Sequence, residues 1–277
     1  MPFGPVPIVW PDGANSTTIY STLSTPGFTS GEATAINADS AIIGYAFSGT
    51  TAHAFRWKQS GNIWPTPEDL NFLSPSGVQT YAYAIADDGS IAGKTRPSST
   101  APFHAFKTAG QPFDLSSETI DMGTMGGTAS EASDMNELKG TVGRSQLTNG
   151  VWRAFLLPIS APNLANSAIY EICGLPGVNR TDWSSAAYGV NKFGQVVGYS
   201  QIEDLNHNLI PRAVLYSDQT GVTIDLNNIT LDCGQTPAGL GWTLTQAQAI
   251  NDNDVIVGYG SLSGRSTAWI LYPKFQD

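Results

Sequence analysis

The sequence has few charged residues and no long apolar run. Charged side chains make up 13% of its 277 residues, with 13 Lys and Arg against 23 Asp and Glu. The net charge of −10 argues against binding to nucleic acid or to an anionic membrane, because Lys and Arg supply the attraction to phosphate. No apolar stretch approaches the roughly 20 residues that a membrane-spanning helix needs. We therefore expect neither nucleic-acid nor membrane partners.

Motifs for common cofactor and catalytic chemistries are also missing. The three histidines are scattered, and the two cysteines lack metal-ligand spacing. There is no G-x-S-x-G elbow, and GTMGG at 123–127 lacks the Lys of a P-loop. The acidic turns DDG (87–89) and NDND (251–254) are typical of hairpins, which outweighs a calcium-binding interpretation. We expect no metal and no cofactor.

Glycine (29) and proline (17) are abundant instead, which indicates many short strands joined by tight turns. The first residues, MPFGPVPIVW, resemble a trimmed mature end. Three N-x-S/T sequons, at Asn15, Asn179 and Asn228, predict N-glycosylation. Together these features favour a secreted protein or one of the secretory-pathway lumen.

The two cysteines occupy matching places in successive repeats. Cys173 lies 19 residues after Ala154, and Cys233 lies 20 after Ala213. Equivalent loops of neighbouring repeats can come close enough for a disulfide. The sequence therefore predicts a Cys173–Cys233 disulfide, with two separate buried thiols as the alternative.

Three landmarks recur five times in fixed order. The residues closing a short apolar run are Asn37, Ala86, Asn136, Asn191 and Asn251, at spacings of 49, 50, 55 and 60. Seven residues later come Gly44, Gly93, Gly143, Gly198 and Gly258. An Ala-aromatic or Ala-Val step follows at 54–55, 105–106, 154–155, 213–214 and 268–269. A fixed period of this size indicates a solenoid or a propeller.

Each repeat alternates apolar and polar residues with period two and reads as four short strands. Four strands per 50 residues are typical of a β-propeller blade. We predict one all-β propeller domain over residues 1–277 with five blades, six being the alternative. The expected repeats are approximately 31–80, 81–129, 130–184, 185–244 and 245–277, the last completed by residues 1–30.

The two ends of the chain should share one blade. Repeat five stops after its third strand, and PIVWPDGANSTTIYSTL resembles the third and fourth strands of repeat one. Pairing the N- and C-terminal strands would close the ring and leave no open sheet edge. The third strand of that blade is then supplied twice, so either PIVWP is an extra strand or the blade is irregular.

The pattern resembles the HAF repeat, a motif of secreted and largely uncharacterised proteins. It is carried by Ala35-Ile36-Asn37, Ile43-Gly44-Tyr45 and His53-Ala54-Phe55, with degenerate copies in the other repeats. The resemblance covers nearly the whole chain. It implies a propeller and a secretory location but no chemistry, because such folds carry unrelated functions.

Loop length indicates the face that binds ligands. The long connections are 72–83, 115–133, 173–187, 201–211 and 231–248. Five residues before the closing position, at the crown of the tunnel, come Glu32, Tyr81, Glu131, Ala186 and Gln246. Three before it come Thr34, Tyr83, Ser133, Tyr188 and Gln248. These residues are not kept the same from repeat to repeat, which favours one asymmetric pocket over identical repeated sites.

Two further registers carry cations. Tyr45, Lys94, Arg144, Tyr199 and Tyr259 follow the strand glycines, and His53, His104, Arg153, Arg212 and Thr267 precede the Ala-aromatic step. Each buried cation needs an anionic or carbonyl partner, within the blades or on a ligand. Trp183 and Trp242, at matching places in two long loops, either wall a pocket or pack between blades.

A lone asymmetric pocket without a cofactor motif suits an enzyme that orients one or two small molecules. Orientation alone can supply roughly 7–11 kcal/mol, and cationic donors stabilise charge that develops on oxygen. A cyclisation, an isomerisation or a cycloaddition can be catalysed in this way. A secreted carbohydrate-binding propeller is the alternative, and a structural or protein-interaction propeller is a further one.

In size, secretory features and sequons the chain is similar to the fungal hetero-Diels–Alderases of tropolone sesquiterpenoid biosynthesis. This resemblance implies an intermolecular cycloaddition of a tropolone quinone methide with a humulene-type terpene, and no residue is carried over from it. From register we expect catalytic roles for Arg144, Tyr81, Tyr188 and Gln246. We expect substrate contacts from Glu32, Tyr83, Lys94, His104, Glu131, Trp183, Trp242 and Gln248. A homodimer is the expected assembly.

Overall fold

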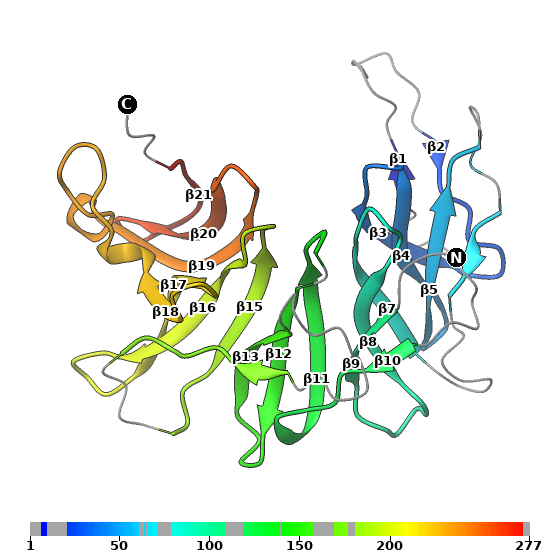
Figure 1. Ribbon diagram of the computed structural model, residues 1–277, viewed down its shortest axis with the longest axis horizontal. Coiled ribbons are helices and arrows are strands. Elements are labelled where there is room, and N and C mark those ends of the chain that lie inside the picture. Colours follow the sequence, from blue (N-terminus) through cyan, green and yellow to red (C-terminus); the bar gives the residue numbers. More distant parts are fainter. Residues whose placement is uncertain are drawn as a thin grey trace. The chain divides into compact units, whose positions relative to one another are not determined.

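The computed structural model describes residues 7–9, 21–60, 64, 66–70, 79–108, 119–138, 140–157, 169–176 and 181–273. The chain falls into two compact units, Met1–Asp121 and Met122–Asp277. The elements described are β-strands and two short 3-10 helices (Figure 1). Within this part of the chain, no helix is long and apolar enough to cross a membrane.

The first unit contains one hairpin and two four-stranded sheets. The hairpin pairs β1 (Ile8–Val9) with β2 (Ser21–Thr22). The first sheet, blade one, consists of β3 (Ser30–Ile36), β4 (Ala41–Ser48), β5 (Thr51–Lys58) and β6 (Glu68–Asp69). Blade two consists of β7 (Gln79–Ile85), β8 (Ile91–Arg96), β9 (His104–Thr108) and β10 (Thr119–Asp121). Each strand pairs antiparallel with the next in sequence, as in a propeller blade.

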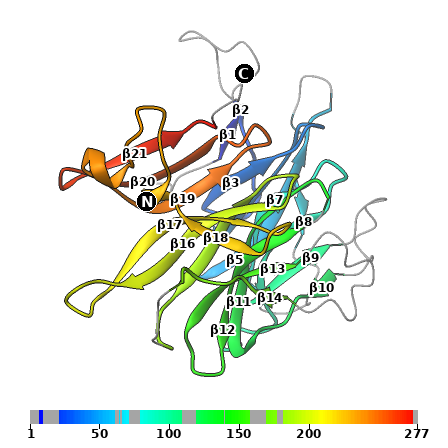
Figure 2. The same cartoon turned by 60° about the vertical axis from the view of Figure 1, so that its left-hand side comes forward.

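The second unit contains three further sheets. Blade three consists of β11 (Gly126–Met135), β12 (Thr141–Leu147), β13 (Trp152–Leu157) and β14 (Tyr170–Glu171). Blade four consists of β15 (Ser185–Val190), β16 (Gln195–Glu203), β17 (Leu209–Ser217) and β18 (Val222–Asp225). Helices η2 (Leu226–Asn228) and η3 (Ala238–Leu240) follow. Blade five has β19 (Trp242–Ile250), β20 (Ile256–Leu262) and β21 (Arg265–Leu271) (Figure 2).

The strand glycines are explained by a bulge in the first strand of each blade. The register of β15 shifts between Ala187 and Gly189, opposite Gly198. A Cβ added at Gly198 would lie 2.0 Å from the Ala186 carbonyl oxygen. The other four strand glycines meet the equivalent carbonyl at 1.9–2.2 Å. No side chain fits there, so glycine is required at this place in every blade.

The closing asparagines join neighbouring blades. The Asn136 carboxamide accepts hydrogen bonds from Leu138 N and Gly140 N within its own turn. Its Nδ2 donates to the carbonyl of Asn191, the closing residue of the next blade, at 2.8 Å. Asn191 donates in turn to Asn251 O, and Asn37 donates to Ala86 O. The residue that defines the repeat in the sequence is thus also the contact between repeats.

Apolar side chains fill the seams between the blades. Ile43 and Leu70 of blade one pack with Ile91 and Phe106 of blade two. Corresponding clusters join blade three to blade four and blade four to blade five. Burial of each aliphatic side chain contributes roughly 1.5–3 kcal/mol, so these seams hold each unit together.

The first and last described strands belong to sheets with fewer than four strands. Leu23 N donates to Pro7 O at 2.9 Å, as Leu70 N does to Ala54 O at 2.8 Å between the third and fourth strands of blade one. The β1–β2 hairpin therefore has third-and-fourth-strand geometry, as its sequence suggests, while blade five has three strands within the described residues. A third strand is present at both ends. The shared closing blade and the single-domain ring concern the arrangement of the two units, and they stay predictions.

Candidate functional site

The crown residues and the residues after the strand glycines lie opposite one another across the first two strands of each blade. β3 and β4 pair Glu32 with Tyr45, and β7 and β8 pair Tyr81 with Lys94. The other pairs are Glu131–Arg144, Ala186–Tyr199 and Gln246–Tyr259. Two registers chosen separately from the sequence thus meet as cross-strand neighbours, a spacing at which side chains interact.

In the second unit, blade three contributes a salt bridge at this position. Arg144 Nε donates to Glu131 Oε1 at 2.6 Å, and the guanidinium lies 4.6 Å from the centre of the Trp152 ring. Both partners are half-buried. Among the described residues, the terminal nitrogens of Arg144 have no hydrogen-bond partner. The hydrogen bond from Nε to Glu131 and the contact between the guanidinium plane and the Trp152 ring therefore hold Arg144 in place. Its terminal N–H groups remain available to a ligand.

Blade four adds two tyrosines beside this arginine. The Tyr188 and Tyr199 rings lie 6.0 Å apart, and within the described part of the chain neither hydroxyl has a hydrogen-bond partner. Burial and the neighbouring Tyr199 raise the pKa of Tyr188 to about 12, although the charge of Arg144 opposes that rise. Burial likewise raises the pKa of Tyr199. Both phenols therefore stay protonated and can donate hydrogen bonds at neutral pH.

Blade five completes the cluster. Tyr259 Oη donates to Gln246 Oε1 at 2.5 Å, and Gln248 Nε2 donates to the same oxygen at 3.2 Å. Tyr259 is 46% exposed, and its proximity contributes to the raised pKa of Tyr188. We call Arg144, Tyr188, Tyr199, Tyr259 and Gln246 the phenol cluster. It brings together donors from three consecutive blades.

The first unit holds a second, more aromatic cluster. Tyr45 Oη donates to Glu32 Oε2 at 2.5 Å, and burial followed by this hydrogen bond raises the pKa of Tyr45. The Tyr45 ring lies 4.9 Å from Tyr81, which stacks on Tyr83 at 6.2 Å. Lys94 Nζ lies 5.2 Å from the Tyr81 ring and 5.5 Å from the Tyr83 ring. The three phenol rings and the ammonium form one aromatic platform.

His104, whose substrate contact stays a prediction, pairs with a carboxylate of its own blade. Its Nδ1 lies 2.9 Å from Asp121 Oδ2 of the fourth strand. The equivalent residues His53 and Arg153 pair with fourth-strand carboxylates in the same way. In blade four, Asp225 caps η2, and Arg212 Nε is buried without a partner among the described residues. In blades one to three, this register holds the third and fourth strands together.

The two matched tryptophans differ in their surroundings. The carbonyl of Trp183 accepts a hydrogen bond from Arg153 Nη1, and its ring lies 3.7 Å from the Arg153 guanidinium. The ring also covers Gly174, where an added Cβ would lie 2.3 Å away. Trp183 therefore packs within the seam between blades three and four. Trp242 is half-buried and lines an open groove beside β21.

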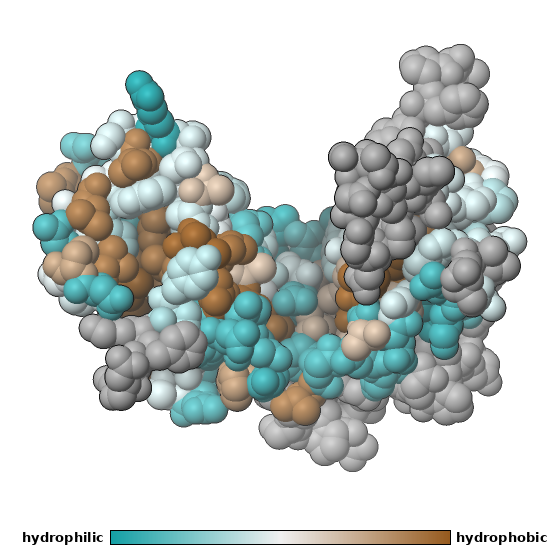
Figure 3. Space-filling model, turned by 90° about the horizontal axis from the view of Figure 1, so that it is seen from above, coloured by the Kyte–Doolittle hydropathy of each residue, from teal (hydrophilic) through white to brown (hydrophobic). Residues whose placement is uncertain are grey.

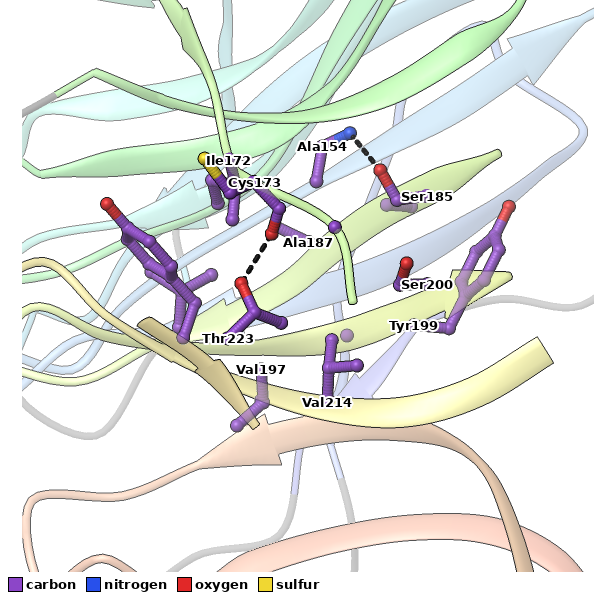
Figure 4. A pocket seen from close by; sticks show the side chains of 15 residues that line it. Ala154, Ile172, Cys173, Ser185, Ala187, Val197, Tyr199, Ser200, Val214 and Thr223 are labelled. Carbon is purple, nitrogen blue, oxygen red and sulfur yellow. Dashed lines mark hydrogen bonds between the residues drawn. The ribbon is translucent and has the colours of Figure 1, made fainter. Parts of the chain in front are cut away.

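The seam between blades three and four offers no room for a ligand. Its cavity of about 10 Å³ lies between Ala154, Cys173, Ser185, Tyr199 and Thr223 (Figure 4). A water molecule needs about 10–15 Å³. The groove beside β21 in the next seam has a volume of about 780 Å³. The described residues include no group of three metal-ligating side chains.

The predicted disulfide is wrong, because Cys173 and Cys233 are both free and exposed. Cys173 follows the fourth strand of blade three and lines the seam with blade four. Cys233 follows blade four and lines the groove beside blade five. Matching positions in successive repeats are thus one blade apart, on opposite sides of blade four, whereas a disulfide needs Cα atoms within about 7 Å.

Of the three sequons, only Asn228 lies within the described residues. It is exposed on η2, and its Nδ2 donates to Asp225 Oδ2 at 3.3 Å. Asn15 and Asn179 lie outside the described residues. N-glycosylation stays a prediction.

Tyr199 and Tyr259 were not among the residues expected to act on a substrate, although their register was recognised. The strand glycine is the signal that identifies them. The residue after this glycine pairs with a crown residue on the bulged first strand, so the two residues belong to one site. Trp152 and Phe103 had no such signal. They reach Arg144 and Lys94 through pairing of the second and third strands, which the repeat pattern does not specify.

The sequence comparisons give limited information. A family model described as a protein of unknown function (DUF3466) matches residues 177–270, which is about a third of the chain. No curated protein matches the sequence.

Solved structures give a clearer result for the fold. The structure of putative TolB from Agrobacterium tumefaciens matches with a TM-score of 0.52 and 13% identity, covering 95% of this chain and 81% of that one. A puromycin-hydrolysing peptidase from Mycobacterium tuberculosis has a TM-score of 0.44 and 11% identity, with 87% and 36% covered. The α-L-arabinofuranosidase PaAbf62A from Podospora anserina, crystallised with cellotriose, has a TM-score of 0.39 and 10% identity, with 93% and 90% covered.

The likeness to TolB, together with the sheet topology, confirms the predicted all-β fold of propeller type. At this level of identity it says nothing about activity. Membership of the HAF-repeat family stays a prediction.

Proposed function

We propose that this protein is a cofactor-independent enzyme of secondary metabolism that joins two small molecules by cycloaddition. The phenol cluster carries the proposal. Tyr188, Tyr199 and Arg144 hold donors without partners among the described residues, side by side on neighbouring blades. Such preorganised donors stabilise negative charge that develops on an oxygen atom.

The reaction we propose is the hetero-Diels–Alder addition that the second sequence resemblance implies. The heterodiene is the exocyclic methylene and the carbonyl of a tropolone quinone methide, and its partner is an alkene of a humulene-type terpene. One C–C bond and one C–O bond form while three π bonds become one. No group leaves and no electrons are gained or lost. Donors on the carbonyl oxygen withdraw electron density from the heterodiene and speed its attack on the alkene.

Each residue of the cluster has a distinct role in this proposal. The Tyr188 and Tyr199 hydroxyls and the terminal nitrogens of Arg144 donate to the tropolone oxygens. Glu131 and Trp152 orient the guanidinium, and Gln246 orients the Tyr259 hydroxyl. The apolar terpene would lie over the aromatic rings. Secretion, homodimer formation and the absence of nucleic-acid and membrane partners stay predictions.

The direct test is turnover. Purified protein is incubated with a humulene-type terpene and a quinone methide generated from a tropolone precursor, and the adduct is quantified by mass spectrometry. We expect adduct formation above the uncatalysed rate. Tyr188→Phe and Tyr199→Phe should each lower kcat by about 10- to 100-fold, the effect of losing one donor to developing charge.

Tyr170→Phe is the matched control. Tyr170 lies on the outer strand of blade three and donates to Asp218 at 2.8 Å, so its loss should leave kcat unchanged. Adduct formation at the background rate would contradict the enzymatic proposal. Equal losses in all three variants would contradict the role of the phenol cluster.

Carbohydrate binding is the second candidate, and the aromatic platform of the first unit favours it. Stacked phenol rings with an adjacent polar group suit the apolar face of a sugar ring. A screen of simple sugars by thermal shift distinguishes the two functions. Stabilisation by a sugar that is lost in Tyr81→Ala, without any adduct formation, would replace the enzymatic proposal by this one.

A further inference from the structure

Two neighbouring seams of the second unit have the same construction but different outer walls. Between blades three and four, β18 closes the seam, and Thr223 Oγ1 donates a hydrogen bond to Cys173 O (Figure 4). The cavity left there is about 10 Å³. Between blades four and five, the corresponding groove measures about 780 Å³. Its outer wall is missing because blade five has no fourth strand among the described residues.

The open groove is apolar. Side chains from the segment after blade four and from blade five line it: Ile229, Leu231, Trp242, Leu244, Trp269 and Leu271. Ile270 and Tyr272, which also line it, are 48% and 72% exposed. Figure 3 shows hydrophobic residues (brown) at the surface of the second unit, on the left of the view. The groove itself carries one charged lining residue, Asp232.

The backbone of β21 is arranged to accept another strand. In blades one and three, the carbonyl of the third-strand Ala accepts a hydrogen bond from the fourth strand, at 2.8 Å from Leu70 N and 2.9 Å from Ile172 N. Ala268 occupies that place in β21 and pairs with Tyr259 on its other side. Its carbonyl receives a 3.2 Å contact from the Thr267 hydroxyl, and no backbone donor of the described residues reaches it. An unpaired edge is a template for strand addition.

The other blades also show which side chains the added strand should carry. In blades one to three, the fourth strand places a carboxylate against a basic side chain of the third strand, as in His53–Asp69, His104–Asp121 and Arg153–Glu171. Blade five has the neutral Thr267 at that register. A carboxylate on the added strand would have no basic partner there, whereas the equivalent carboxylates of blades one to three each have one. In the added strand, the side chain at the position equivalent to Thr223 of β18 would enter the apolar groove.

We propose that the β21 edge binds an extended peptide strand of another polypeptide, antiparallel to β21. The peptide is uncharged opposite Thr267 and apolar where it enters the groove. Main-chain hydrogen bonds provide affinity and the groove provides selectivity, as in other strand-addition complexes. The fourth-strand-like segment β2 is already paired with β1. This site is distinct from the phenol cluster and independent of the proposed function.

The native cysteines provide the test. The probe is an acetylated and amidated octapeptide of residues 221–228, changed at Thr223→Val and Asp225→Thr, so that it reads GVVITLNN. Its binding to the full chain is measured by calorimetry. The rate at which iodoacetamide alkylates each cysteine is followed by mass spectrometry. We expect one peptide per chain and at least tenfold slower alkylation of Cys233, which lines the groove.

Cys173 is the internal control, because it is also free and exposed but lies one blade away; its rate should not change. A peptide with an N-methyl group at the Leu226 position cannot donate to Ala268 O and should bind at least tenfold more weakly. Equal binding of the N-methylated peptide, or equal protection of both cysteines, would overturn the proposal. So would slow alkylation of Cys233 before any peptide is added, since the chain itself would then cover the edge.

Discussion

At the scale of single residues, the closing asparagine shows how a sequence signature follows from a structural requirement. The Asn136 amide is 5% exposed and makes three hydrogen bonds, two to its own turn and one to the next blade. Only a side chain with both a donor and an acceptor at that length can do this. Ala86 replaces it in blade two, where a side-chain contact of this kind is impossible.

Replacing Asn136 by Ala should lower the free energy of unfolding by about 2–3 kcal/mol, because buried backbone groups lose their partners. Urea denaturation measures the change. Asn253→Ala is the control, since the structure gives the Asn253 side chain no hydrogen bond and it is exposed. It should change stability by less than about 0.5 kcal/mol. Equal effects of the two substitutions would show that the interblade bond contributes nothing.

Tyr188 should make stability depend on alkaline pH. Its folded-state pKa of about 12 exceeds the ordinary value of about 10. The folded state therefore holds the proton more tightly, and this stabilisation is complete below about pH 10 and lost as the pH rises towards 12. Tyr188→Phe should lose less stability than wild type between pH 9 and 11.5 in denaturant titrations. Parallel losses would mean that Tyr188 titrates as it does in the unfolded chain.

At the scale of strands, the sequence predicted which segments form and missed how they are offset. Alternation identified the strands because one face of each is buried. The bulges at Ala187 and at equivalent places are not visible in that alternation, although the strand glycines marked them. Alternation alone therefore does not relate the crown register to the post-glycine register, whereas the strand pairing places their residues opposite one another.

Gly198→Ala should be severely destabilising. Its Cβ would lie 2.0 Å from a backbone carbonyl oxygen that cannot move without breaking the β15–β16 pairing. We expect a loss of about 3 kcal/mol or more. Gly239→Ala in η3, where the added Cβ meets only the Thr236 hydroxyl at 3.3 Å, should shift Tm much less. Similar Tm values for both variants would contradict the close approach.

At the scale of the whole molecule, repetition was the strongest signal in the sequence. It correctly predicted blades of four antiparallel strands and an incomplete last blade. The disulfide predicted from the repeat was wrong. Cysteines at equivalent positions of successive repeats are separated by a whole blade. The candidate site depends on the residues in which the repeats differ, and the sequence alone offered only their registers.

The free cysteines lead to a prediction for the intact chain. Thiol titration in denaturant without reductant should find two reactive thiols per chain. A reducing agent should leave Tm unchanged, because there is no cross-link to break. No reactive thiol per chain, with a Tm lowered by reductant, would restore the disulfide.

The central claim is that the phenol cluster binds an oxygen-bearing ligand through donors that the fold holds in place. The most direct measurement is a crystal structure of the protein soaked with tropolone. We expect the tropolone oxygens within about 2.6–3.2 Å of the Tyr188 hydroxyl, the Tyr199 hydroxyl or a terminal nitrogen of Arg144. Tropolone bound elsewhere on the chain, with these three groups turned to solvent, would contradict the account.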